Sequence, residues 1–296
     1  MINAHPKLQT WMTLGRISNL PTVWTNTFAA LLLTSSTTAL PIPSSAALIL
    51  LLTLVSLLYL AGMLLNDFID SDWDQQHQNP RPIILGLVSR RQVGLAIGIL
   101  LSLALAVLLY LSQLLDQPQW VLSFSLVLIG LIFAYNLGHK KYTHSVWLMG
   151  GCRSAVYLTA ASSLAAPPEL LWLCAVLLGT YISGLTYLAR QEHRNQILSY
   201  APMLLMLSPI LLIIYADSIW FWLVLSLWLG WLGWNYWHYL ACSTTRQVRT
   251  FIGAGLAALP LFDALVLTLA HQPLGSLLCV LVFYSLPYLQ RWVKPT

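Results

Sequence analysis

The sequence predicts an all-α fold, a polytopic transmembrane helical bundle with nine or ten spans, and composition is the first reason. Of the 296 residues, 58% are hydrophobic and only 8% are charged, whereas a soluble domain has roughly 25% charged residues. A soluble chain so poor in charge would expose large apolar patches and aggregate. The composition therefore indicates an integral membrane protein. Its net charge of +5 reflects topology on this interpretation, and we expect no nucleic-acid partner.

Apolar runs long enough to cross a bilayer, which takes about 20 residues, are the second observation. Two of these runs are the least certain, because Pro260 and Asp263 interrupt one and Pro287 interrupts the other. No linker or charge run marks a second domain, so residues 1–296 are predicted to form a single transmembrane domain. The ten candidate spans are 20–36, 46–65, 93–112, 119–137, 146–165, 169–188, 199–216, 219–239, 250–270 and 274–290.

The distribution of Lys and Arg is the third observation, because basic residues collect in cytoplasmic loops. Five alternate connections contain neither residue: 37–45, 113–118, 166–168, 217–218 and 271–273. Thirteen of the fourteen basic residues fall in the termini and the other connections: Lys7, Arg16, Arg81, Arg90, Arg91, Lys140, Lys141, Arg190, Arg194, Arg246, Arg249, Arg291 and Lys294. This pattern predicts ten spans with both termini cytoplasmic, and we expect a multi-pass protein of a bacterial inner (plasma) membrane.

The cysteines show no metal-site pattern. Cys152, Cys174, Cys242 and Cys279 are scattered through apolar segments without paired spacing. They are therefore predicted to be small buried hydrophobic residues.

The stretch from Asn66 to Gly86 is the most polar part of the chain and follows the second span. If that span continues as a helix, Asn66, Asp67, Asp70 and Asp74 are spaced by three or four residues and share one face. Carboxylates on one face repel unless a cation lies between them. Oxygen ligands of this kind suit Mg²⁺, which prefers one or two carboxylates, waters and substrate phosphate oxygens. The stretch therefore predicts a magnesium and diphosphate site on the cytoplasmic side.

Neighbouring residues complete this hypothesis or weaken it. Asp72 points away from the shared face and is expected to be solvated. Arg81, with Arg90 and Arg91 nearby, can contact phosphate directly. The alternative is a solvated polar loop, since loops are usually polar, but the pattern N-D-x-x-D-x-x-x-D followed by N-P-R-P-I is more specific than acidity alone.

These residues carry a resemblance to a known family. The stretch Ala61–Asp67, together with Asp70, Asp74, Asn79–Ile83 and Ser89–Arg91, is similar to the first aspartate-rich motif of the UbiA superfamily of intramembrane prenyltransferases. The resemblance implies a UbiA-like bundle and Mg²⁺-dependent transfer of an isoprenyl group from its diphosphate to an acceptor, often an aromatic one.

The same resemblance implies roles for individual residues. Asn66, Asp67, Asp70 and Asp74 would hold diphosphate through Mg²⁺, and Arg81 falls on the family's arginine after the motif. The motif would face the cytoplasm after the second span, as the charge pattern also predicts.

The chain departs from the family after the sixth span, where a second aspartate-rich motif is expected. That position reads Tyr187-Leu-Ala-Arg-Gln-Glu-His-Arg194, with Glu192 as its one acid and no aspartate. Arg190 and Arg194 lie four residues apart and are candidates for direct diphosphate contact; alternatively, they are topology charges. Two stretches, Met149–Arg153 and Gly184–Glu192, are similar to the EboC-like branch of the superfamily, which is associated with specialised metabolites.

Arg153 and Lys140 are further candidates. Arg153 lies inside the fifth predicted span, where a charge costs at least about 2.5 kcal/mol. We expect it to face the bundle interior and to pair with Glu192, the aspartates or substrate diphosphate, as a catalytic residue beside Asp67 and Asp70 or as half of a structural ion pair. Lys140 follows the fourth span, near the position of a basic family residue that approaches diphosphate; alternatively, it is a topology charge.

Other polar residues within the spans receive weaker predictions. Asp263 is expected to be protonated or hydrogen-bonded, without an assigned role. Asn235 and His238 are three residues apart, and the histidine is expected to be a satisfied interior residue. The rings of Tyr157, Tyr181 and Tyr187 are candidates to line an apolar pocket and shield an allylic cation.

The sequence favours a Mg²⁺-dependent prenyltransferase acting on prenyl diphosphate and a hydrophobic, electron-rich acceptor in the lipid bilayer. The alternative is a UbiA-like membrane translocator or carrier of a specialised-metabolite precursor, which the missing second motif favours. A third and weaker hypothesis is a structural assembly factor, for which an intact metal motif would be unnecessary.

Overall fold

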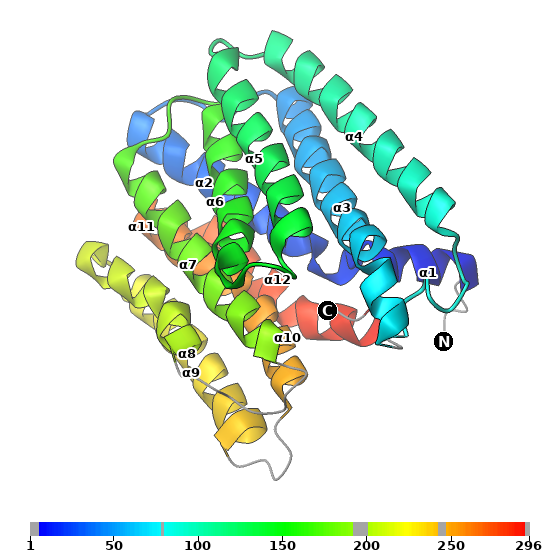
Figure 1. Cartoon of the computed structure of the whole chain (residues 1–296). Helices are drawn as coiled ribbons and strands as arrows, with labels where there is room; N and C mark the ends of the chain where they lie inside the picture. The colour runs from blue at the N-terminus through cyan, green and yellow to red at the C-terminus, as the bar shows by residue number, and fades with distance from the viewer. Residues whose placement is uncertain (1–5, 78–79, 192–200, 242–246, 294–296) are drawn as a thin grey trace.

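The computed structural model describes residues 6–77, 80–191, 201–241 and 247–293, and within these ranges it contains helices and no strands. In chain order the elements are α1 (Pro6–Leu14), η1 (Ile17–Asn19), α2 (Leu20–Thr38), α3 (Ser45–Gln76), α4 (Arg90–Gln113), α5 (Pro118–Gly138), η2 (Thr143–Ser145), α6 (Val146–Ser162), α7 (Glu169–Gln191), α8 (Ala201–Met206), η4 (Ser208–Tyr215), α9 (Ile219–Tyr236), η5 (Trp237–Ala241), α10 (Val248–Ala257), α11 (Leu259–Leu269) and α12 (Pro273–Trp292). Figure 1 shows them as one bundle.

The helices match the ten predicted stretches. Six segments are long and apolar enough to cross a membrane: α3, α4, α5, α7, the α10–α11 pair and α12. Helices α2, α6 and α9 are apolar and have 19, 17 and 18 residues. The shorter apolar pair α8 and η4 fills the tenth position. The predicted all-α, multi-pass bundle of nine or ten spans is therefore confirmed.

Prolines divide some spans but not others. The ninth predicted span is interrupted at Ala258, and Pro260 lies in the first turn of α11, where its missing N–H is tolerated. The seventh is divided into α8 and η4, with Pro209 in the first turn of η4. In contrast, Pro287 lies inside the continuous helix α12.

Helix α3 is longer than a membrane span requires. Its 32 residues extend about 48 Å at a rise of 1.5 Å per residue, against a hydrocarbon core of about 30 Å. Ser44 caps its start by accepting a hydrogen bond from the backbone N–H of Ala47. The predicted span 46–65 therefore continues without a break through the acidic stretch, whose last turns project beyond the hydrocarbon.

Two groups of helices build the bundle. Helix α6 packs against α7, α5 and α2, and α3 pairs along its length with α4. In the other group, α11 packs against α12, α2 and α9. The carboxyl-terminal ends of α3, α5 and α7 lie at one end of the bundle, at the bottom of Figure 1. This arrangement brings the predicted cytoplasmic connections together.

The contact between α6 and α7 depends on Gly150. A Cβ atom at this position would overlap the carbonyl oxygen of Gly179 and the hydroxyl of Ser183. We expect Gly150→Ala to destabilise the protein by about 1–3 kcal/mol through overpacking, which a thermal unfolding scan in detergent measures. The control is Gly151→Ala, whose Cβ would meet Leu131 at an ordinary 3.4 Å. Equal melting temperatures for the two variants would contradict this account of the packing.

Candidate active site at the end of α3

The acidic face predicted from the spacing is present on α3. Asp67, Asp70 and Asp74 are buried, with 4%, 8% and 4% of their surface exposed. Asp72 points the other way, is 69% exposed, and forms an ion pair of 2.8 Å with Arg90. Arg90 therefore lies outside the acidic face in this structure, although it was a candidate for phosphate contact.

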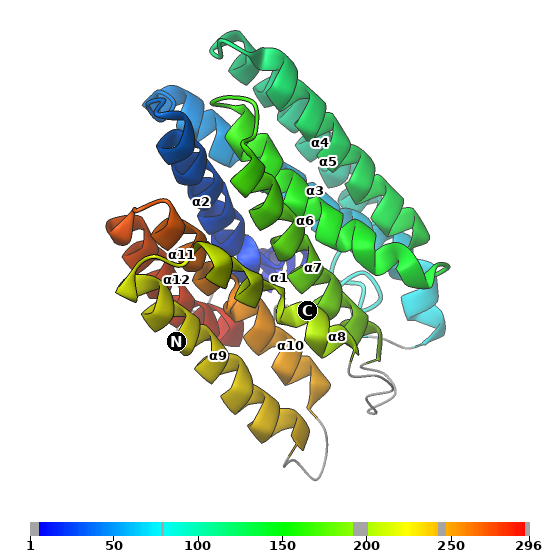
Figure 2. The ribbon, with the colours of Figure 1, turned by 90° about the vertical axis from the view of Figure 1, so that its left-hand side faces the viewer.

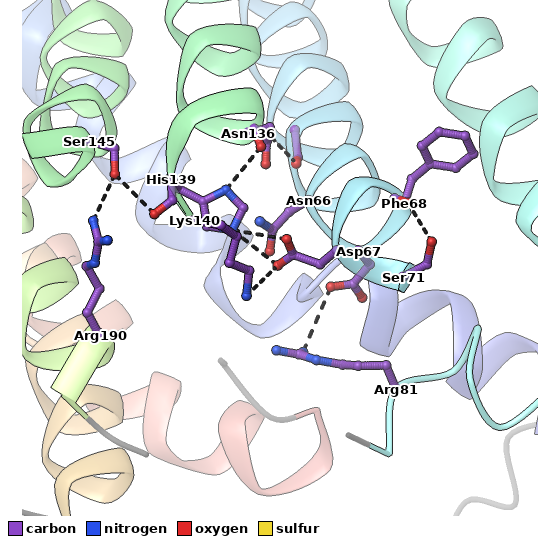
Figure 3. Close-up of polar contacts among 12 residues, drawn as sticks. Asn66, Asp67, Phe68, Ser71, Arg81, Asn136, His139, Lys140, Ser145 and Arg190 are labelled. Carbon is purple, nitrogen blue, oxygen red and sulfur yellow. Dashed lines mark hydrogen bonds and ion pairs between the residues drawn. The ribbon is translucent and has the colours of Figure 1, made fainter. Parts of the chain in front are cut away.

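Two arginines approach the first half of the acidic face. Arg16 Nη2 lies 3.5 Å from Asp67 Oδ1 and donates a hydrogen bond of 3.1 Å to Asn66 Oδ1. Arg81 Nη1 lies 3.9 Å from the same Asp67 oxygen (Figure 3). The predicted proximity of Arg81 to the motif is thus observed, whereas Arg16 joins the site from the turn before the first span.

Two residues at the end of α5 approach Asp70 from another side. His139 Nε2 lies 3.1 Å from Asp70 Oδ1 and 3.2 Å from Oδ2, and Lys140 Nζ lies 3.3 Å from Oδ2. The Lys140 ammonium also lies 3.8 Å from the centre of the Trp73 ring. Lys140 therefore lies where the sequence predicted a cation near the diphosphate site.

The surroundings shift the pKa values of Asp67 and Asp70 in opposite directions. Burial raises the pKa of Asp67, and Arg16 and Arg81 offset this only in part. Burial also raises the pKa of Asp70, but the hydrogen bond from His139 and the charges of His139 and Lys140 lower it by more. The pKa of Asp70 is therefore below its usual value. Arg16 and Arg81 therefore favour the charged form of Asp67 against the larger effect of burial on its pKa.

Arg16 and His139 are site residues that the sequence interpretation missed as functional groups. Arg16 was counted only as a topology charge, because it lies 50 residues from Asn66 in the chain. The structure places Arg16 in the left-handed conformation, at φ 44° and ψ 48°, which costs roughly 1–2 kcal/mol for a residue other than glycine. Tyr59 holds this turn by donating a hydrogen bond of 3.0 Å to the Arg16 carbonyl.

An apolar cavity opens beside the acidic face. It has about 700 Å³ of empty space, its open mouth included, and lies between α2, α3, α5 and α6. Arg16 and Asn66 line it together with apolar side chains such as Leu58 and Val156. The aromatic rings in its wall belong to Tyr59 and Tyr135.

The tyrosines predicted to line a pocket have other positions. Tyr157 and Tyr181 are fully buried, and neither they nor Tyr187 belong to the wall of this cavity. Tyr181 donates a hydrogen bond of 2.8 Å to the Gly255 carbonyl. The prediction was wrong for this cavity because several tyrosines share the helical spacing and only packing selects among them.

Arg153 faces the bundle interior as predicted, but its partners differ. Nη1 donates a hydrogen bond of 2.8 Å to Asn26 Oδ1, and Nη2 donates one of 3.0 Å to Thr22 Oγ1. Asn26 Nδ2 in turn donates to both Asp263 oxygens at 2.9 Å. The expectation of pairing with the aspartate motif was therefore wrong, because α2 supplies polar groups at the depth of Arg153.

Three other predictions have clear outcomes. Asp263 is hydrogen-bonded to Asn26 and Tyr157, as one expected alternative had it. Asn235 is buried and donates 2.7 Å to the Trp231 carbonyl. In contrast, His238 is exposed and stacks on Trp234, with the two ring centroids 5.1 Å apart. The prediction of an interior histidine was therefore wrong.

Comparison with known proteins assigns the chain to a family. The model of the UbiA prenyltransferase family matches residues 22–262. The protein is a member of this family. A solved structure described as "Structural and mechanistic insights into the biosynthesis of Digeranylgeranylglyceryl phosphate synthase in membranes" has the same fold, with a TM-score of 0.57 and 19% identity over 91% of this chain and 98% of that chain. A search of curated proteins gives no match.

Membership of the UbiA family supports membrane prenyl transfer in general and raises the question of a metal. Within the described residues, no group of three or more His, Cys, Asp or Glu side chains converges as a metal site. The donors nevertheless fit Mg²⁺, because this ion needs only one or two carboxylates when waters and substrate phosphates complete its shell. Asp67 and Asp70 supply such oxygens on the acidic face, each facing a cation in this structure.

Arg190, Glu192 and Arg194 occupy the position at which the UbiA family has its second aspartate-rich motif. Arg190 Nη1 donates to the carbonyls of Tyr142 and Thr143, at 2.7 and 3.1 Å, and to Ser145 Oγ at 3.0 Å. It thereby fixes the connection between α5 and α6, apart from the acidic face in Figure 3. Glu192 and Arg194 lie outside the described residues, and their roles stay predictions, as does the EboC-like branch.

Proposed function

We propose that the protein transfers a prenyl group from a prenyl diphosphate to an electron-rich acceptor within the membrane. The supporting observation is the buried acidic face of α3 beside an apolar cavity whose wall includes Asn66 and Arg16. Asn66, Asp67, Asp70 and Asp74 would hold Mg²⁺ with the diphosphate. When bound, the ion would stabilise the negative charge of the leaving diphosphate.

The residues of this chain would divide the remaining work. Arg16, Arg81 and Lys140 already face the acidic side chains and are positioned to contact diphosphate oxygens. Such charge-assisted hydrogen bonds are among the stronger ones. They would supply some of the binding that the UbiA family obtains from its second aspartate motif, from the turn after α1, the connection after α3 and the residues that follow α5.

The cavity would hold the prenyl chain and exclude water. In the reaction, the bond between the allylic carbon and the diphosphate oxygen breaks with both electrons leaving on the diphosphate. A new bond forms between that carbon and the acceptor, which releases a proton. The apolar wall disfavours attack by water, and the rings of Tyr59 and Tyr135 in that wall would stabilise the developing cation.

The proposal includes an orientation. The carboxyl-terminal ends of α3, α5 and α7 lie at one end of the bundle, and the distribution of basic residues supports a cytoplasmic position for this end. Prenyl diphosphate would then enter from the cytoplasm and the acceptor from the bilayer, in a bacterial inner membrane.

Removal of divalent metal tests the proposal. Purified protein with geranyl, farnesyl or geranylgeranyl diphosphate and a panel of aromatic acceptors is expected to form products of higher mass only with Mg²⁺. Excess EDTA should lower the rate at least about 100-fold, as loss of the charge stabilisation requires, and added Mg²⁺ should restore it. Mass spectrometry measures the products.

The outcomes separate this proposal from the translocator alternative, which the missing second aspartate motif favours. Mg²⁺-dependent binding of a prenyl diphosphate without product across the panel would support a carrier. Product formation that persists in EDTA would contradict the proposed role of the acidic face.

A further inference from the structure

Arg153 is a cation on the wall of the cavity, inside a membrane-spanning helix. It is half-buried on α6 and belongs to the cavity lining. A guanidinium has five N–H donors, and among the described residues the structure shows one bond from Nη1 to Asn26 and one from Nη2 to Thr22. Three donors therefore have no protein acceptor within the described chain, at a depth where unpaired polar groups are costly.

The charge of Arg153 is balanced within the protein. Asp263 is fully buried on α11, and its two oxygens accept hydrogen bonds from Asn26 and Tyr157. These contacts suit an ionised carboxylate, which only accepts hydrogen bonds. With Asp263 in that form, Asn26 links one guanidinium and one carboxylate, and the cluster as a whole carries no net charge.

Arg16 and Arg153 are the two cations among the described residues of the cavity wall, and they have different settings. Arg16 is bound to Asn66 and Asp67 of the α3 motif. Arg153 is held by α2, through Asn26 and Thr22, and contacts no residue of the acidic face within the described part of the chain. The cavity wall thus has a second polar position, at Arg153, which is separate from the proposed diphosphate site.

We propose that Arg153 binds the acceptor by donating a hydrogen bond to a neutral oxygen, a hydroxyl or a carbonyl, on a side chain of the acceptor ring inside the cavity. The proposal rests on the proposed function, since it takes the cavity to be the chamber for transfer. A neutral oxygen satisfies the unused donors. An anionic group would add an uncompensated negative charge to a cluster that is already neutral, in an apolar interior.

Binding of matched phenols tests the proposal. The probes are 4-hydroxybenzyl alcohol and 4-ethylphenol, which differ by a hydroxyl in place of a methyl, and 4-hydroxybenzoate, which is anionic. We expect the wild-type protein in detergent to bind the alcohol at least about tenfold more tightly than 4-ethylphenol, as one hydrogen bond to a charged donor allows. Calorimetry measures the dissociation constants.

Variants assign this preference to Arg153. Arg153→Met should bind the alcohol and 4-ethylphenol equally. If this variant is unstable, Arg153→Met/Asp263→Asn replaces it, because the double variant removes both charges and keeps the cluster neutral. It too should bind the two probes equally. Tyr157→Phe is the matched control. It removes the hydrogen bond from Tyr157 to Asp263, and Tyr157 lies outside the cavity wall. It should keep the preference of the wild type.

Each other outcome overturns the proposal. Equal binding of the alcohol and 4-ethylphenol by the wild type would contradict the proposal, as would a preference for the alcohol that both Arg153 variants keep. An equal loss of the preference in Tyr157→Phe would indicate a structural role for the cluster. Tighter binding of 4-hydroxybenzoate than of the alcohol would refute the charge argument. Mg²⁺-dependent binding of geranylgeranyl diphosphate is measured on the same samples and should be unchanged in Arg153→Met; its absence from the wild type would count against the proposed function instead.

Discussion

Asp70→Asn is expected to lower kcat/KM for prenyl transfer at least about 100-fold, equivalent to about 2.7 kcal/mol of transition-state stabilisation. Asp70 is buried on the acidic face and contacts His139 and Lys140. The amide keeps the size of the side chain but removes the charge that would hold Mg²⁺. Initial rates with labelled geranylgeranyl diphosphate measure the effect.

Asp72→Asn is the matched control. Asp72 lies on the same turn of α3 but is exposed and paired with Arg90. An exposed ion pair contributes about 0–1 kcal/mol, so activity should stay within about twofold of the wild type. Similar losses in both variants would show that the acidic face has no special role, and full activity of Asp70→Asn would exclude this carboxylate from catalysis.

Arg16→Gln is expected to have the next largest effect, with kcat/KM reduced about 10- to 100-fold. The variant removes the cation 3.5 Å from Asp67 and the hydrogen bond to Asn66. Because burial raises the pKa of Asp67 and Arg16 lowers it, loss of Arg16 should raise that pKa further. The ionised carboxylate is the metal-binding form, so the acid limb of the pH–rate profile should move to higher pH.

Lys7→Gln controls for the loss of a charge from the same segment. Lys7 is exposed on α1, and its replacement should leave both the rate and the pH profile unchanged. If Arg16 served only to stabilise the fold, Arg16→Gln would lower the melting temperature without moving the acid limb. That result would remove Arg16 from the site.

The order of spans and the position of the acidic face were predictable from the sequence. Apolar length and the restriction of Lys and Arg to alternate connections fix the spans, because both follow from the bilayer itself. The three- and four-residue spacing of Asp67, Asp70 and Asp74 predicts one face wherever α3 stays helical, as it does to Gln76.

Contacts between distant segments were not predictable in the same way. Arg16 reaches Asn66 across 50 residues, and Asn26 reaches Asp263 across 237. No periodicity within a helix encodes such pairings, which depend on how helices rotate and cross. For the same reason, sequence alone did not select Tyr59 and Tyr135 as the rings in the cavity wall.

A structure of the protein with Mn²⁺ and geranylgeranyl thiolodiphosphate, an unreactive analogue, tests the central claim most directly. Anomalous scattering locates the metal. The account predicts Mn²⁺ bound to carboxylate oxygens of Asp67 or Asp70 and to the diphosphate, with the prenyl chain in the cavity lined by Leu58 and Val156. Diphosphate bound elsewhere, with no metal on the acidic face of α3, would contradict it.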